Sequence, residues 1–132
     1  MATIFSKIIS REVPAHIVAE DDKHIAFMDV NPLVVGHVLV VPKIEVDYIF
    51  DLDDLALCDL MVFAKGVSIA LRDSVDCIRI GLTVIGLEVP HTHIHLIPMS
   101  HVKDMNFAKS KLTLSNEELK ATAELIRKNY LR

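Results

Sequence analysis

The sequence predicts a single α+β domain over residues 1–132, built on a five-stranded antiparallel meander sheet. Five short apolar segments bounded by turn residues are typical of strands, and they cover residues 15–19, 24–29, 36–41, 77–85 and 94–99. Three other segments have helical spacing, and they lie at both ends of the chain and in its middle. The chain is 52% apolar and has no repeat or linker, so it can bury one core.

The first half of the chain is predicted to hold a short helix, a β-hairpin and a third strand. Thr3 precedes apolar residues at helical spacing, so we expect a helix over residues 4–9 with Thr3 as its N-cap. The acidic turn at 20–23 separates the first two strands and makes them a hairpin. The third strand is strongly apolar, has His37 at its start, and is stopped by Pro42.

The second half is predicted to begin with a long helix at about 52–72, whose acidic N-terminal residues suit the helix macrodipole. Residues 60–64 of this helix are apolar on every side, and such a segment cannot face water on any side. Because a lone domain would expose a large apolar patch there, we expect a second copy of the chain to cover it. After two more strands, a Ser115-x-x-Glu118 capping box opens a C-terminal helix at about 115–130.

Composition excludes several classes of function. The formal charge is −4, from 14 basic and 18 acidic residues spread along the chain, so there is no basic surface for duplex nucleic acid. No signal peptide and no membrane-spanning segment is evident, which predicts a cytoplasmic protein without a membrane partner. Cys58 and Cys77 lie in apolar runs without CxxC spacing, and we expect both thiols to be reduced and buried.

Residues 90–98 carry the functional signal. His91, His93 and His95 occupy alternate positions, so in an extended strand their side chains should share one face. Three imidazoles on one face indicate either a metal site or an imidazole that acts as a nucleophile. The metal hypothesis lacks a clear set of outer carboxylates and an acid to act on metal-bound water.

The same residues resemble the His-x-His-x-His-x-x signature of the histidine-triad (HIT) nucleotide-binding proteins. Residues 4–9 with 13–15, then 25–32 and 36–43, resemble that family's opening, its nucleoside-holding strand and turn, and its next strand. The match covers residues 3–111. It implies a HIT-like fold, a nucleoside phosphoramidase or nucleotide hydrolase, and a homodimer whose two sheets join across a two-fold axis. It implies no required cofactor and no metal ligands, although a zinc ion with a minor structural role is compatible with it.

The resemblance also implies a role for each site residue. His93 would attack the α-phosphorus of a purine nucleotide derivative, such as a phosphoramidate, an adenylate or a dinucleoside polyphosphate. The transient nucleotidyl-histidine would then be hydrolysed, or the nucleotidyl group transferred.

The resemblance also places the other site residues. His95 would lie at the leaving-group side, and His37 would complete the polar cluster. His91 would orient His93 through its backbone carbonyl. Asp29 would accept hydrogen bonds from the ribose hydroxyls. The base would contact an apolar slot formed by Phe5, Ile8, Phe27, Met28 and Val30. The phosphate oxygens would face the backbone of a turn formed by Gly86, Leu87, Glu88 and Val89.

One segment departs from the family's pattern. Many members carry Gly-Gln-Ser or Gly-Gln-Thr before the triad, whereas this chain has Gly86-Leu87-Glu88. Leu87 cannot donate a hydrogen bond and an inward Glu88 would repel phosphate, which leaves Thr83 as the polar residue at the end of the preceding strand. Two alternatives to the covalent enzyme therefore stay open: a nucleotide sensor with little turnover, and a His-ligated metal hydrolase.

Some residues also have an ordinary structural interpretation. Asp29 precedes Asn31-Pro32 and could simply bond its own backbone in a turn. His16, His24 and His101 lie outside any motif, and we expect them at the surface or in loops.

Overall fold

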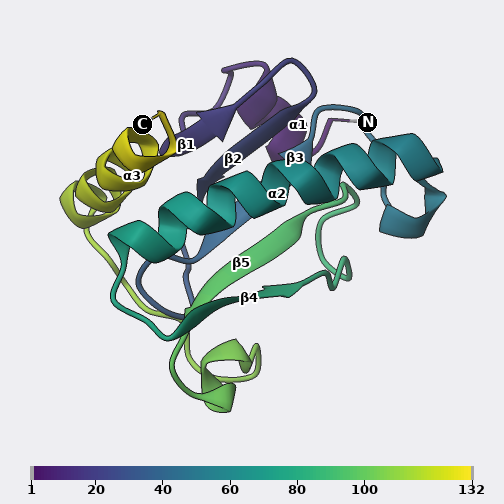
Figure 1. Cartoon of the computed structure of the whole chain (residues 1–132). Coiled ribbons are helices and arrows are strands. Elements are labelled where there is room, and N and C mark those ends of the chain that lie inside the picture. Colours follow the sequence, from purple (N-terminus) through teal and green to yellow (C-terminus); the bar gives the residue numbers. More distant parts are fainter. Residues whose placement is uncertain (1, 132) are drawn as a thin grey trace.

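The structure is a computed structural model that describes residues 2–131. Its strands form one antiparallel sheet in the order β1-β2-β3-β5-β4 (Figure 1). This confirms the predicted α+β class and five-stranded sheet. The order departs from a simple meander at one step, because β5 pairs with both β3 and β4 and leaves β4 at the edge. The strands are β1 (Ile17–Glu20), β2 (His24–Met28), β3 (Val38–Pro42), β4 (Arg79–Thr83) and β5 (Ile94–Met99).

The three predicted helices are present. They are α1 (Ile4–Ile9), α2 (Asp54–Ser74) and α3 (Asn116–Leu131). Two short 3-10 helices, η1 (Ile49–Asp51) and η2 (Val102–Met105), were not predicted. Helix α2 crosses one face of the sheet, with α3 packed against α2 and β1 (Figure 1). Helix α1 packs on the opposite face.

Two capping boxes explain where the terminal helices begin. The Thr3 hydroxyl accepts the Ser6 N–H at 3.1 Å, and the Ser6 hydroxyl accepts the Thr3 N–H at 2.8 Å. In the same way, the Ser115 hydroxyl accepts the Glu118 N–H at 3.1 Å, while the Ser115 N–H faces the Glu118 carboxylate. Both boxes satisfy backbone donors that have no partner within the helix.

Strand alternation divides the core into two clusters, one on each face of the sheet. Under α2 and α3 lie the even-numbered strand residues Ala26, Met28, Val38, Val40, Ile94 and Leu96. Against α1 lie the odd-numbered ones, Ile25, Phe27, Leu39 and Val41, which pack with Phe5 and Ile8. The same alternation, continued one residue before β5, assigns His93 and His95 to the α1 face.

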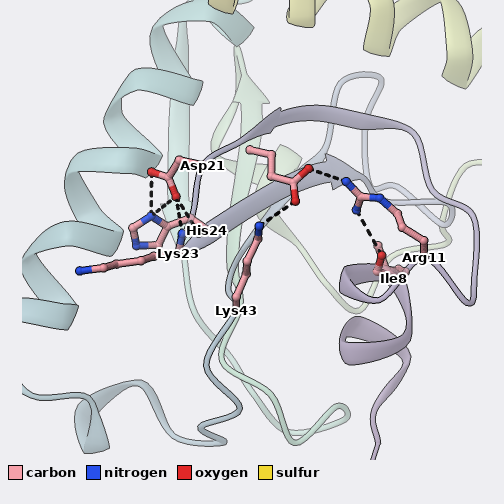
Figure 2. Close-up of polar contacts among 7 residues, drawn as sticks. Ile8, Arg11, Asp21, Lys23, His24 and Lys43 are labelled. Atoms are coloured by element: carbon pink, nitrogen blue, oxygen red, sulfur yellow. Dashed lines mark hydrogen bonds and ion pairs between the residues drawn. The ribbon is translucent and has the colours of Figure 1, made fainter.

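A cluster of ionic contacts fixes the end of α1 against the sheet (Figure 2). Arg11 donates to the Ile8 carbonyl at 3.4 Å and also pairs with the Glu20 carboxylate. Lys43 reaches the same carboxylate at 2.8 Å. The hydrogen bond from Lys43, together with Arg11, holds the pKa of the Glu20 carboxyl below its usual value. Helix α1 is thereby tied to the ends of β1 and β3.

Two expectations about exposure were wrong. His24 is buried rather than at the surface, because it is an even-numbered residue of β2 and lies beneath α2. Its Nδ1 contacts the Asp21 carboxylate at 2.9 Å (Figure 2), and its ring stacks on Phe63 with centroids 5.0 Å apart. Cys58 is exposed and Cys77 is half-buried, so neither thiol is buried as predicted.

Helix α2 has one apolar side that the described chain leaves uncovered. In the predicted apolar segment Leu60, Phe63 and Ala64 are buried, whereas Met61 and Val62 are 41% and 70% exposed. No helix within residues 2–131 is long and apolar enough to cross a membrane.

Gly36, next to His37, is predicted to be essential for stability. Its φ is +91°, and a Cβ at this position would lie 2.9 Å from Val75 Cγ2 and 3.0 Å from Pro98 Cγ. Gly36→Ala should therefore lower the free energy of unfolding by about 2–4 kcal/mol, from backbone strain and overpacking together. Gly86 has a similar φ of +70°, but a Cβ there would have no atom within 4 Å. Gly86→Ala should cost only the strain, about 1–2 kcal/mol. Urea denaturation measures both, and equal losses would contradict the steric argument.

Candidate functional site

A cavity of about 500 Å³ opens on the α1 face of the sheet. Its walls come from α1, the end of β2, the turn before β5 and the segment after η2. Most of the wall is apolar, and a few polar side chains converge on one end, an arrangement typical of small-molecule sites. The polar and charged side chains in the wall are Asp29, Asn31, Glu88, His93, His95 and Lys111.

Most of the predicted site residues line this cavity. They are Phe5, Ile8, Phe27, Met28, Asp29, Val30, Gly86, Leu87, Glu88, Val89, His93 and His95. His37 and His91 are buried behind the wall, where they contact its residues. Thr83 is not brought to the cavity: it pairs with His95 across β4 and β5, on the strand that lies at the sheet edge.

His93 is oriented by a backbone group. Its Nδ1 lies 2.7 Å from the His91 carbonyl oxygen, which can only accept, so Nδ1 carries a proton. In the neutral ring this leaves the lone pair on Nε2. The Phe5 ring packs edge-on at 4.8 Å between centroids and holds the imidazole in the cavity wall. The carbonyl contact expected from the resemblance is therefore present.

His91 does not line the cavity with the other two histidines. It precedes β5, and its ring is fully buried. Its Nε2 donates to the Pro42 carbonyl at 2.8 Å, while Nδ1 lies 3.3 Å from the Thr3 hydroxyl. The ring therefore joins the end of β3 to the cap of α1, and only its carbonyl acts on His93.

His37 and His95 form a chain of fixed tautomers. The Leu33 N–H donates to His37 Nδ1 at 3.0 Å, so this atom carries the lone pair. His37 Nε2 must then carry the proton, which it donates to His95 Nδ1 at 2.9 Å. The proton of neutral His95 is left on Nε2, on the cavity side. Because the hydrogen positions follow from the partners, one backbone amide determines both tautomers.

Both rings are kept neutral. Burial, and then the nearby His95, lowers the pKa of His37 to about 3. Burial, and then the nearby His93, lowers the pKa of His95 to about 4. Desolvation disfavours a charged imidazole, so at neutral pH His95 presents a proton donor without a positive charge.

Asp29 makes the turn contact considered for it and also lines the cavity. One carboxylate oxygen accepts the Asn31 N–H at 2.9 Å, as in a turn that bonds its own backbone. The other lies 3.6 Å from His37 Nε2, and the side chain lines the cavity. Burial raises the pKa of the Asp29 carboxyl. The turn therefore presents a fixed acceptor oxygen to any ligand.

Ligand atoms of Asp29, His37 and His95 lie within 4.8 Å of one another, which is close enough to surround a metal ion. The tautomer chain opposes this use. The His37 atom that faces the group carries a proton, and moving that proton to Nδ1 would set it against the Leu33 N–H. In this arrangement the His37 Nε2 proton is held between the two rings.

Sequence reasoning missed part of the cavity wall. Phe107 packs on His95 with ring centroids 4.8 Å apart and on His37 at 6.2 Å. Lys111, four residues later in the chain, also lines the cavity. Both residues lie in an irregular segment without helical or strand periodicity. The one feature of the sequence that could have pointed to this part of the wall was a lysine near the end of the family match. The other unpredicted lining residues are Ile4, Val13, Pro14, Ala15, Asn31, Leu39 and Ile85.

The fold and the site together define an α+β protein with a pair of ordered histidines beside a small-molecule cavity. A model of the HIT domain matches residues 10–102, and the chain belongs to this family. It is 37% identical over 134 residues to an uncharacterized HIT-like protein of Borreliella burgdorferi, across 96% of both chains. It is 36% identical over 98 residues to the adenosine 5'-monophosphoramidase of Saccharomyces cerevisiae, covering 74% of this chain and 62% of that one.

A solved structure agrees. The crystal structure of a Hit-like protein involved in cell-cycle regulation from Bartonella henselae superposes with a TM-score of 0.83 at 30% identity. The superposition covers 96% of this chain and 95% of the other.

The neutral state of His95 predicts a loss of stability in acid. Its pKa is about 4 in the folded protein and returns to about 6.5 in the unfolded chain. Between these values the unfolded chain binds more protons, so the free energy of unfolding falls as the pH is lowered through this window. His95→Asn places an acceptor oxygen near the position of Nδ1 and removes the titrating ring. The variant should lose less stability over the same range.

Urea denaturation at several pH values between neutral and about pH 4.5 measures the two slopes. Equal slopes for the parent protein and His95→Asn would contradict the neutral, desolvated state of His95.

Proposed function

We propose that the protein is a nucleotide-binding hydrolase of the nucleoside phosphoramidase type, which acts at the α-phosphate of a purine nucleotide derivative. The observation that carries the proposal is the hydrogen bond from His93 Nδ1 to the His91 carbonyl, which leaves Nε2 free as a nucleophile. The His95 ring lies beside it, with centroids 5.0 Å apart. The name of the yeast relative, adenosine 5'-monophosphoramidase, supports the same class of reaction.

The cavity suits a nucleoside. Its apolar part, with Phe5, Ile8 and Phe27, offers a slot for the flat face of a base. The Asp29 oxygen that does not accept the Asn31 N–H would accept from the ribose hydroxyls. These two contacts would direct the phosphate toward the two histidines.

The reaction would take place in two balanced steps. His93 Nε2 forms a bond to the α-phosphorus, the bond to the leaving group breaks, and the proton on His95 Nε2 moves to the leaving atom. The His95 imidazolate that results is stabilised by the hydrogen bond from His37 Nε2. A water molecule then gives a proton back to His95 and attacks phosphorus, and the bond to His93 breaks. Nucleoside monophosphate is released and both histidines regain their starting tautomers. Attack by another acceptor in place of water would make the protein a nucleotidyl transferase.

Glu88 and Leu87 favour the second candidate function, a nucleotide sensor with little turnover. Both line the cavity, where family members with Gln and Ser or Thr would offer donors, and neither side chain stabilises negative charge on phosphate. A metal hydrolase is a weaker alternative, because the protonated His37 Nε2 opposes coordination at the site. We therefore expect activity without an added metal or other cofactor. The expected location is the cytoplasm.

His93→Ala should abolish turnover and leave nucleotide affinity within a few-fold, since a nucleophile contributes far more to the transition state than to ground-state binding. The rate should drop by at least about three orders of magnitude. Incubation of the parent protein with an adenylate labelled at phosphorus, an alkaline quench and digestion should place the label on the peptide that contains His93.

His95→Asn should lower the turnover rate most for substrates with poor leaving groups, because it removes the proton donor.

Three outcomes separate the candidate functions. Label on His93 with turnover insensitive to a chelator supports the covalent enzyme. Tight binding of nucleoside monophosphate without turnover would favour the sensor. Unlabelled histidines with activity abolished by a chelator would overturn the covalent route.

The proposal includes a homodimer. Leu55, Val62 and Ile69 are spaced by seven residues along α2, so they form one stripe, and they are 69%, 70% and 56% exposed. Ile78 and Leu82, at the neighbouring edge strand β4, are 59% and 43% exposed. An exposed apolar stripe beside an unpaired strand edge favours association with a second copy.

Val62→Glu should convert the dimer to a monomer, because it places a charge in the centre of the apolar stripe. Light scattering at micromolar concentration gives the masses of the parent and the variant. Ala121→Glu, on the exposed side of α3, adds the same charge outside the stripe and should remain dimeric. A parent protein of monomer mass would contradict the prediction.

A further inference from the structure

The cavity has an unusual charge balance for a nucleotide site. Asp29 and Glu88 bring negative charge to its wall, and His95 is neutral. The turn before β5 offers Leu87 and Glu88 where side-chain donors could have faced the phosphate. Among the described lining residues the one lysine or arginine is Lys111. A phosphate placed at His93 would therefore have a single side chain of permanent positive charge near it.

Lys111 is placed beside the histidines by its contacts with Phe107. Its Nζ donates to the Phe107 carbonyl at 3.2 Å and lies 5.9 Å from the centroid of the Phe107 ring. That ring in turn packs on His95. An ammonium group has three N–H donors, and the one protein acceptor found for Nζ leaves two for a ligand.

The backbone of the segment is anchored at the other end of the site. The Leu112 N–H donates to the Pro32 carbonyl at 2.8 Å, which holds the chain next to Lys111 against the loop that carries Asp29. Electrostatics agrees with this placement. Burial is the largest influence on the pKa of Asp29, His37 and His95, and Lys111 lowers the pKa of all three groups. The ammonium therefore acts on both the ribose side and the phosphate side of the site.

We propose that Lys111 is the phosphate-binding cation of this site, and that it supplies the charge and the side-chain donors that the turn at Gly86-Leu87-Glu88 does not. The inference rests on the proposed function, because it takes the ligand to be a nucleoside phosphate. The nucleoside contacts through Asp29 and the apolar slot are then separate from the phosphate contact through Lys111. Affinity for a nucleoside and affinity for its phosphate should respond differently to substitution.

Calorimetry with adenosine and with adenosine monophosphate tests this separation without depending on turnover. Lys111→Met keeps the length of the side chain and removes its charge. It should weaken binding of the monophosphate by about 10-fold, a low value for a hydrogen-bonded ion pair because the side chain is exposed. Binding of adenosine should stay within about two-fold. Lys111→Arg should retain most of the affinity for the monophosphate.

Two further variants serve as references. Lys103→Met removes an exposed lysine of η2 that does not line the cavity, and it should leave both affinities unchanged. Asp29→Asn should weaken adenosine and the monophosphate alike, since it acts on the ribose.

The outcomes distinguish the inference from the function on which it rests. Equal weakening of both ligands by Lys111→Met would overturn the inference, because the side chain would then act on the nucleoside or on the structure. Unchanged affinity for the monophosphate would overturn it as well. A parent protein that bound neither ligand would overturn the proposed nucleotide site, and the inference with it. Loss of monophosphate affinity alone, retained in Lys111→Arg, supports it.

Discussion

The hydrogen bond from the Leu33 N–H to His37 Nδ1 determines the tautomers of two buried histidines of the site. Since a backbone amide can only donate, it fixes the lone pair on Nδ1 of His37, the proton on its Nε2, and so the proton on Nε2 of His95. The His91 carbonyl accepts a hydrogen bond from His93 Nδ1, so Nδ1 carries the proton and the lone pair of the neutral ring is on Nε2. Two backbone groups thus set an unprotonated ring nitrogen of neutral His93 beside a protonated ring nitrogen of His95.

Neutral histidines also suit the burial of the site. Burial lowers the pKa of His37 and His95 to about 3 and about 4, so neither ring carries a charge that would need water or a partner at neutral pH. Phe107 can then cover both rings. The consequence is a shortage of positive charge where a phosphate would bind, with Asp29 and Glu88 nearby. A cation from outside the triad would compensate for this shortage of positive charge, and the proposed cation is Lys111, which lines the same cavity.

Local patterns in the sequence predicted what local physics decides. Strand alternation placed His93 and His95 on one face, and the Thr3 and Ser115 caps located two helices. The patterns failed where a distant segment decides the environment. His24 is buried only because α2 passes over it, and Phe107 enters the site from an irregular segment. The position of β4 at the sheet edge, which keeps Thr83 out of the cavity, follows from pairings between strands that no single segment encodes.

The cavity and the exposed apolar stripe of α2 lie on opposite faces of the sheet. Odd-numbered residues of β2, β3 and β5 contribute to the α1 face with its cavity, and even-numbered ones support α2. Helix α2 then carries its own exposed stripe on the side away from the sheet. A substitution at Val62 is therefore separated from His93 by the helix and the thickness of the sheet. Association with a second copy could affect the site in two ways. The second copy could contribute residues to it, or the effect could pass through β4, where Thr83 pairs with His95 of β5.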